Sequence, residues 1–240
     1  MLSVNGLTAQ IGKIPVLRGV TLAVKSAETV AILGRNGVGK TSTLRAILGL
    51  LRRTGGTVEY DGTLLNPLPA HKLAGLGIGY VPQGRGIFPL LTVEENLLLG
   101  VRGKPNSHTV DEVFTRFPRL KERLHQTAGT LSGGEQQMLA ISRCLLIEPK
   151  LIILDEPTEG IMPKLVQQIR NEIADIARKG IAVLLVEQNV RTALRLADRI
   201  YLMERGQIVH EGTAASLQAS PDIVHRYLGV ALKPQAGVSP

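Results

Sequence analysis

The most specific chemical pattern in the sequence is a glycine-rich segment near its start. Gly34 is followed by four residues and then by a Gly-Lys-Thr triplet; the whole segment is Gly34, Arg35, Asn36, Gly37, Val38, Gly39, Lys40, Thr41 and Ser42. Glycines let the backbone curl so that successive N–H groups converge on phosphate oxygens. We expect the ammonium of Lys40 to reach the outer phosphates of ATP and the hydroxyl of Thr41 to bind Mg²⁺. The competing interpretation is a strand–helix turn that binds no ligand.

Two adjacent carboxylates follow an apolar run much later in the chain. Asp155 and Glu156 come directly after Leu-Ile-Ile-Leu at 151–154. Ligands of open α/β sheets bind at the carboxyl ends of strands. We expect Asp155 to hold Mg²⁺ through water and Glu156 to orient and polarise an attacking water. Taken alone, the pair could simply cap the next helix, but together with the glycine-rich segment it predicts nucleotide hydrolysis.

A third pattern begins 23 residues before Asp155 and consists of Ser132, Gly133, Gly134, Glu135 and Gln136. Ser132 can cap a helix, and Glu135 three residues later completes a capping box. The two glycines let a phosphate approach the helix N-terminus closely. Ser-Gly-Gly alone is a weak signal, so its weight comes from its position before the Asp155 strand.

The elements that must position these motifs alternate along the chain. Apolar, β-branched runs predict strands at 4–9, 20–24, 29–33, 57–60, 78–81, 151–154, 182–186, 199–203 and 207–209. Helical patterns cover 40–51, 110–117, 120–125, 133–148, 164–178 and 190–197, and a further helix opens at Thr92. Buried strands joined by helices predict an α/β fold with a mainly parallel sheet. We expect one domain over 1–230, with a helical subdomain at about 85–149 inserted in the core, and a loose tail over 231–240.

Composition bounds the function. The chain has 240 residues, of which 44% are hydrophobic and 20% charged, so a disordered chain and a fibre are excluded. Aromatic residues make up 3%, which argues against stacking on bases. The single Cys144 cannot form an internal disulfide, and a buried core position is favoured over a redox switch. The net charge of +8 fits a nucleic acid, an anionic membrane or a phosphate ligand as partner, or an ordinary solvated surface.

No apolar run approaches the roughly 20 residues that a membrane-spanning helix needs. Residues 182–186 are among the longest apolar runs, and the first five residues do not read as a targeting segment. We therefore expect any role at a membrane to come from docking onto another chain.

Taken together, the three motifs resemble those of ABC-transporter ATPases, and the resemblance covers about residues 2–229. It implies a P-loop fold of the ABC type with an additional N-terminal antiparallel β part. It also implies that two copies sandwich two ATP molecules head to tail, so that Ser132 to Gln136 of one copy face the nucleotide of the other.

Three further positions follow from the resemblance. Gln83 matches the family's glutamine that contacts Mg²⁺ and links the core to the helical subdomain. Gln188 stands at the switch position, which usually carries histidine, and it can donate a hydrogen bond to the γ-phosphate without gaining charge. Ile11 stands where an aromatic residue usually stacks on adenine, and Met162 lies near the usual place of an aspartate.

More narrowly, segments 84–89, 91–97, 155–161 and 186–189 look like the ATPases of branched-chain amino acid importers and of the related urea and short-chain amide importers. This resemblance implies an ATP-hydrolysing subunit at the cytoplasmic face of the membrane, with separate permease chains and, indirectly, a periplasmic solute-binding protein. Phe88 would then belong either to the subdomain core or to a groove for a short helix of the permease.

Two other functions compete with the importer. One is a soluble ABC-type ATPase acting on ribosomes or nucleic acid, which the positive charge favours. Such proteins usually carry two nucleotide domains or a long coiled-coil insert, and neither fits in 240 residues. The other is a nucleotide-binding regulator without turnover, which Glu156 disfavours. We therefore expect no nucleic-acid partner.

Overall fold

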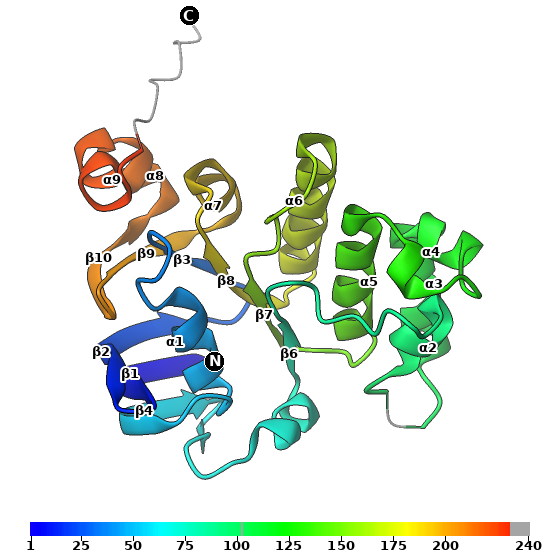
Figure 1. The fold of residues 1–240 in the computed structure, drawn as a ribbon, viewed down its shortest axis with the longest axis horizontal. Coiled ribbons are helices and arrows are strands. Elements are labelled where there is room, and N and C mark those ends of the chain that lie inside the picture. Colours follow the sequence, from blue (N-terminus) through cyan, green and yellow to red (C-terminus); the bar gives the residue numbers. More distant parts are fainter. Residues whose placement is uncertain (102, 231–240) are drawn as a thin grey trace, which may run out of the picture.

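The computed structural model describes residues 1–101 and 103–230, arranged as two β-sheets with helices around them (Figure 1). The loose tail expected at 231–240 lies outside the described residues. Among the helices that are described, none combines the length and the apolar character needed to cross a bilayer.

The central sheet carries the segments that precede the chemical motifs. Its strands are β3 (Thr29–Leu33), β6 (Ile78–Val81), β7 (Leu151–Asp155), β8 (Ala182–Glu187), β9 (Arg199–Glu204) and β10 (Gln207–Thr213), in the order β10-β9-β3-β8-β7-β6. All neighbours are parallel except β9 and β10. Every residue of β3, β7 and β8 is buried, because helices and the second sheet cover both faces. The predicted mainly parallel sheet is confirmed.

The second sheet is antiparallel and comes from the N-terminal part of the chain. Its strands are β1 (Leu2–Ile11), β2 (Ile14–Val24), β4 (Arg53–Tyr60) and β5 (Thr63–Leu64), in the order β2-β1-β4-β5. Helix α1 (Lys40–Ile47) buries Leu44 and Ile47 in the apolar cluster that joins this sheet to β3. The predicted extension of α1 to Leu51 is wrong, because Gly49 takes a left-handed φ of 70°.

Helices fill the chain between β6 and β7. They are α2 (Val93–Leu98), α3 (Ser107–Arg116), α4 (Pro118–Glu122) and α5 (Gly133–Leu145). Thr92 caps α2 with a capping box, and Glu95 is its partner. Pro118 begins α4, two residues before the predicted helix start at 120, because its missing N–H costs nothing in the first turn. Helix α5 ends three residues before the predicted Glu148, which has a φ of 52°.

One apolar cluster runs from these helices into the central sheet. Phe117 and Leu120 are about 1% exposed and belong to the same cluster as Leu154 and Val183 of the sheet. The inserted helical subdomain at about 85–149 therefore stays a prediction, because its core is continuous with that of the α/β part.

The last third adds four helices, α6 (Pro163–Arg178), α7 (Val190–Leu196), α8 (Ala214–Gln218) and α9 (Pro221–Leu228). The first two agree with the predicted ranges to within one residue. The sequence did not predict α8 and α9, because elements of five and eight residues offer too few positions for a helical period.

Strand β6 packs directly against α5 at a glycine. A Cβ atom on Gly79 would overlap the Sγ of Cys144. Cys144 is buried, and burial raises the pKa of its thiol to about 12, so it stays a neutral core group at physiological pH. This environment agrees with the core interpretation of Cys144.

We predict that Gly79→Ala lowers the free energy of unfolding by about 1–3 kcal/mol, because the added methyl overpacks the contact between β6 and α5. Cys144→Ala removes the overlapping sulfur, so the double variant should lose less stability than the two single variants added together. Urea unfolding followed by circular dichroism measures all three. Simple additivity of the two changes would contradict this account of the contact.

Candidate functional site

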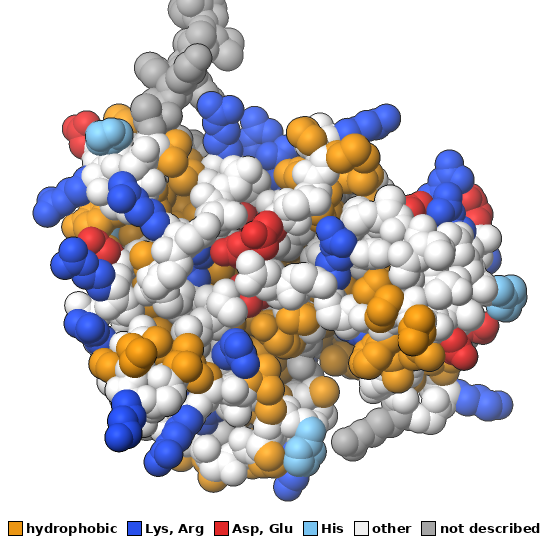
Figure 2. All heavy atoms as spheres, in the orientation of Figure 1, with side chains coloured by type: hydrophobic (Ala, Val, Ile, Leu, Met, Phe, Trp, Pro, Cys, Tyr) orange, Lys and Arg blue, Asp and Glu red, His pale blue; other side chains and the backbone are white. Residues whose placement is uncertain are grey.

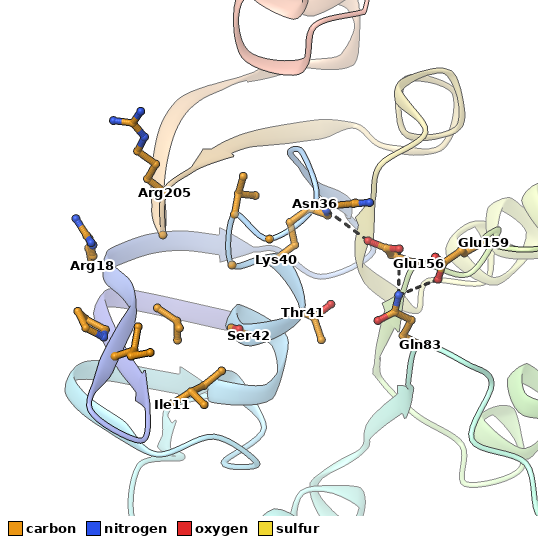
Figure 3. Close-up of a pocket in the computed structure, with 17 residues that line it drawn as sticks. Ile11, Arg18, Asn36, Lys40, Thr41, Ser42, Gln83, Glu156, Glu159 and Arg205 are labelled. Atoms are coloured by element: carbon orange, nitrogen blue, oxygen red, sulfur yellow. Dashed lines mark hydrogen bonds and ion pairs between the residues drawn. The ribbon is translucent and has the colours of Figure 1, made fainter.

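A cavity of about 670 Å³ opens where the two sheets meet the glycine-rich segment (Figure 3). Its walls come from the turn between β1 and β2, the loop after β3, the first turn of α1, the loops after β6 and β7, and the turn between β9 and β10. The sequence-predicted residues among its lining are Ile11, Asn36, Gly37, Val38, Gly39, Lys40, Thr41, Ser42, Gln83 and Glu156.

The glycine-rich segment forms the tight loop that the sequence predicted. Gly39 has a φ of 114°, and a Cβ there would lie 3.1 Å from the methyl of Met203 and 3.2 Å from the carbonyl of Val16. Gly34 packs even closer, because a Cβ there would lie 2.6 Å from the Met203 carbonyl. No side chain caps the start of α1, so its first N–H groups are left for an anion.

Lys40 is the first residue of α1 and is only 4% exposed, because its side chain turns back into this loop. Its Nζ donates hydrogen bonds to the carbonyl oxygens of Gly34 at 3.0 Å and Arg35 at 3.1 Å. It also forms an ion pair with Oε1 of Glu156 at 3.4 Å. The ammonium therefore bridges the loop after β3 and the loop after β7.

Asp155 lies beside the start of α1. Its Oδ1 accepts a hydrogen bond from the Thr41 hydroxyl at 2.9 Å, and its Oδ2 accepts one from Tyr80 at 3.5 Å. Burial raises the pKa of Asp155, and the bond from Thr41 opposes that rise. Burial raises the pKa of Tyr80 to about 12, so its hydroxyl stays a donor. The Thr41 hydroxyl, the Asp155 carboxylate and the side-chain amide of Gln83 all offer oxygen atoms, the ligands that Mg²⁺ prefers. These three residues therefore fit that ion.

Glu156 projects into the cavity from a strained backbone. Its φ is 50°, in the left-handed region, and its N–H donates to the Val186 carbonyl at 3.0 Å. The residue is 9% exposed. Burial raises the pKa of its carboxyl, and the ammonium of Lys40 opposes the rise. Because burial raises its pKa, this carboxylate is suited to accept a proton.

Strand register explains why Gln83 meets Glu156. Val81 pairs with Leu154, and Gln83 and Glu156 each follow two residues later. Nε2 of Gln83 lies 3.4 Å from Oε2 of Glu156 and 2.8 Å from Oε2 of Glu159. Sequence reasoning did not single out Glu159, although its place three residues after Glu156 was a usable signal.

The other end of the cavity is apolar with a basic rim. Ile11 and Ile14 are 56% and 70% exposed on the turn between β1 and β2. Sequence reasoning proposed Ile11 alone and missed the remaining lining residues here, which are Ile14, Pro15, Val16, Arg18, Arg205 and Gly206. The apolar residues on both sides of Gly12-Lys13 were a sequence signal for Ile14, Pro15 and Val16. Arg205 is far away in sequence, and only the fold brings it to the cavity.

Gly34, Arg35 and Asp155 are not among the residues that line this cavity, and two further predicted groups do not line it either. Ser132, Gly133, Gly134, Glu135 and Gln136 form the N-terminus of α5, which stands apart from α1 (Figure 1). Ser132 is exposed and shares a capping box with Glu135, as the sequence predicted. Gln188 is exposed directly after β8, where Glu187 pairs with Leu33, so its backbone follows beside Gly34.

Phe88, in the segment after Gln83, is 51% exposed, and the guanidinium of Arg143 lies 5.8 Å from its ring centre. The interpretation of Phe88 as a core residue is therefore wrong, and the groove for a short helix of the permease stays a prediction.

Charged side chains of both signs are spread over this face of the molecule. Figure 2 shows one group of acidic side chains near the middle of the face, further acidic side chains at its edges, and Lys and Arg side chains both near the middle and at the edges. A continuous basic stripe, typical of nucleic-acid binding, is not seen on the described part of this face.

Comparison with known proteins agrees with this geometry. Residues 17–159 match the family model for the ABC transporter. BraG of Pseudomonas aeruginosa, a high-affinity branched-chain amino acid transport ATP-binding protein, is 45% identical over 95% of this chain and 100% of its own length.

Solved structures have the same fold. MJ1267, an ATP-binding cassette of an ABC transporter, matches in its ADP conformation with a TM-score of 0.81 and 28% identity, over 96% of this chain and 99% of its own. A dimeric post-hydrolysis structure of the cassette MJ0796, bound to ADP and Pi, matches with a TM-score of 0.78 and 28% identity, over 89% of this chain and 99% of its own.

A glycine-rich loop with a buried lysine, followed across the sheet by two carboxylates, thus occurs on the fold of nucleotide-binding cassettes. This chain belongs to the ABC transporter family, as one of its nucleotide-binding ATPases.

Proposed function

We propose that this chain is the ATP-hydrolysing subunit of an ABC importer for branched-chain amino acids or a related small polar solute, such as urea or an amide. The observation that supports ATP hydrolysis is the contact between Lys40 Nζ and Glu156 Oε1, at 3.4 Å inside the phosphate-loop cavity. The likeness to BraG over its whole length supports the cargo class.

ATP binds with its phosphates in the loop from Gly34 to Ser42. Backbone N–H groups of the loop and of the start of α1 donate to the phosphate oxygens, and Lys40 exchanges Glu156 for the β- and γ-phosphates. The adenine ring of ATP lies against Ile11, which offers an apolar face without π-stacking. Ile14 and Val16 extend that face.

Thr41, Asp155 and Gln83 are the residues that would hold Mg²⁺. When bound, the ion neutralises charge on the β- and γ-phosphates. Asp155 is held in place by the Thr41 hydroxyl at 2.9 Å.

Glu156 acts as the base. Once Lys40 has turned to the phosphates, the Glu156 carboxylate is free to orient a water and accept its proton. Its backbone bond to Val186 keeps it at the end of β7. Gln188, directly after the neighbouring strand β8, donates a hydrogen bond to the γ-phosphate.

The working unit is a dimer with a second ATPase subunit, either the same chain or a homologous one. Exposure of Ser132 at the start of α5 supports this, because this N-terminus of α5 is then available to the nucleotide of the other copy. ATP closes the dimer and hydrolysis reopens it. Integral membrane permease subunits convert the motion into transport, with the ATPase bound peripherally at the cytoplasmic face and a solute-binding protein acting on the opposite side.

The net charge of +8 fits the rival action on ribosomes or nucleic acid, but the geometry of the described site adds no support for it. A pull-down from detergent-solubilised membranes separates the two functions: co-purifying membrane-spanning chains support the importer, whereas RNA or ribosomal proteins contradict it. Uptake of labelled leucine, urea and acetamide by cells with and without the gene then assigns the cargo.

Lys40→Ala is expected to abolish nucleotide binding or turnover, because the phosphates lose their buried positive partner. ATPase assays with a fluorescent-nucleotide binding control measure the effect. Retention of more than about a tenth of the wild-type rate, a loss of only ~1.4 kcal/mol, would remove Lys40 from this role.

Glu156→Gln should bind ATP and fail to hydrolyse it, because the amide keeps the shape but is a far poorer base. In Mg-ATP the variant should accumulate as a closed dimer in size-exclusion chromatography. Normal turnover would mean that the catalytic carboxylate lies elsewhere.

Ser132→Arg should stop turnover and leave ATP binding to each monomer intact, because the arginine holds the two copies apart while Gly34 to Ser42 are unchanged. Mixing it with Lys40→Ala chains is the sharper test. Each composite site combines Lys40 of one copy with Ser132 of the other. In a heterodimer of the two variants, one site therefore contains both substitutions and the other site contains neither, so some activity should return. Full activity of Ser132→Arg alone would contradict the shared site.

A further inference from the structure

The side-chain amide of Gln83 has two chemically opposite ends. Its NH₂ group only donates hydrogen bonds, and only its carbonyl oxygen can bind a metal ion. Nε2 donates to Glu159 at 2.8 Å and lies 3.4 Å from Glu156. Figure 3 shows the amide oxygen on the opposite side, pointing toward Thr41. The oxygen thus faces the hydroxyl that is bonded to Asp155.

Glu159 is the better of the two acceptors for holding this orientation. Glu156 makes the longer contact, and its other oxygen pairs with Lys40. Its proposed work as a base also requires the carboxylate to turn toward water. The Glu159 backbone is tied to the same turn, since its N–H donates to the Glu156 carbonyl at 3.1 Å.

A carboxylate also rejects the reversed amide. If the Gln83 amide turned over, its oxygen would face the oxygens of Glu159 and Glu156, and neither carboxylate has a proton to donate when ionised. The amide NH₂ would then point at the metal site, where it cannot act as a ligand.

We propose that Glu159 is a positioning residue that holds the Gln83 amide with its oxygen directed to the metal site of Thr41 and Asp155. The proposal rests on the proposed function, in which Gln83 is a ligand of Mg²⁺. It assigns to Glu159 a part in metal binding without contact between Glu159 and the ion.

The test measures binding rather than turnover. The affinity for a fluorescent, non-hydrolysable ATP analogue is measured with saturating Mg²⁺ and with EDTA. Glu159→Ala should weaken binding in Mg²⁺ by about tenfold and leave binding in EDTA unchanged, the usual scale for losing a group that orients a metal ligand. Glu159→Gln should stay within about twofold of wild type in Mg²⁺, because its own amide oxygen still accepts from Gln83 and the carboxylate of Glu156 still opposes the reversed amide. Glu122→Ala, which removes an exposed carboxylate from α4, serves as the control and should change neither value.

Glu159 is exposed, so folding is not expected to limit the experiment. A loss in EDTA equal to that in Mg²⁺, or a Glu159→Gln variant as weak as Glu159→Ala, would overturn the proposal, because the effect would then be a disturbed loop or a lost charge.

Gln83→Leu separates this proposal from the function on which it rests. In that background Glu159→Ala should have no further effect on Mg²⁺-dependent binding, because no amide remains to be oriented. A further loss would overturn the positioning role alone and would mean that Glu159 acts on the metal by itself. Undiminished Mg²⁺ dependence in Gln83→Leu itself would overturn both the metal role of Gln83 and the proposal.

Discussion

The buried ammonium of Lys40 is the charge around which the site is arranged. Removing an ammonium from water is costly unless hydrogen bonds and an opposite charge replace the lost hydration. Two backbone carbonyls of the loop and the carboxylate of Glu156 do so here. The same three contacts tie the loop after β3 to the loop after β7. A phosphate that enters the cavity can take over the role of Glu156 and so release that carboxylate for chemistry.

The parallel sheet makes this meeting of distant segments possible. In neighbouring parallel strands the carboxyl ends lie at one edge, and the pairs Leu33–Glu187, Asp155–Val186 and Val81–Leu154 fix how far each following loop extends. Thr158 and Glu187 add a link beyond the strands, because the buried Glu187 carboxylate accepts a hydrogen bond from the Thr158 hydroxyl at 2.8 Å. The loops that carry Glu156 and Gln188 are thereby joined.

The carboxylates at the end of β7 and in the loop after it differ in their surroundings, and the roles proposed for them differ accordingly. Asp155 is buried and held by hydroxyl donors, which suits a fixed ligand. Glu156 combines burial with a nearby ammonium and a strained backbone, which suits a group that must change partners. Glu159 is exposed and bonded to an amide, so it can direct a neighbour without being desolvated. Within five residues of the chain, the different surroundings of these carboxylates thus suit the three different roles proposed for them.

Local sequence determined the parts of the site that lie within a few residues of one another. The phosphate loop needs glycine where φ is positive and where the backbone nearly touches Met203, so its pattern is readable without a fold. The capping box at Ser132 and the buried strand before Asp155 are equally local. Tertiary structure alone decided contacts between segments far apart in sequence. Gln83 and Glu159 are 76 residues apart, and Arg205 comes from the turn between β9 and β10. Strand pairing sets such contacts, and pairing depends on packing across the whole sheet rather than on the residues beside each motif.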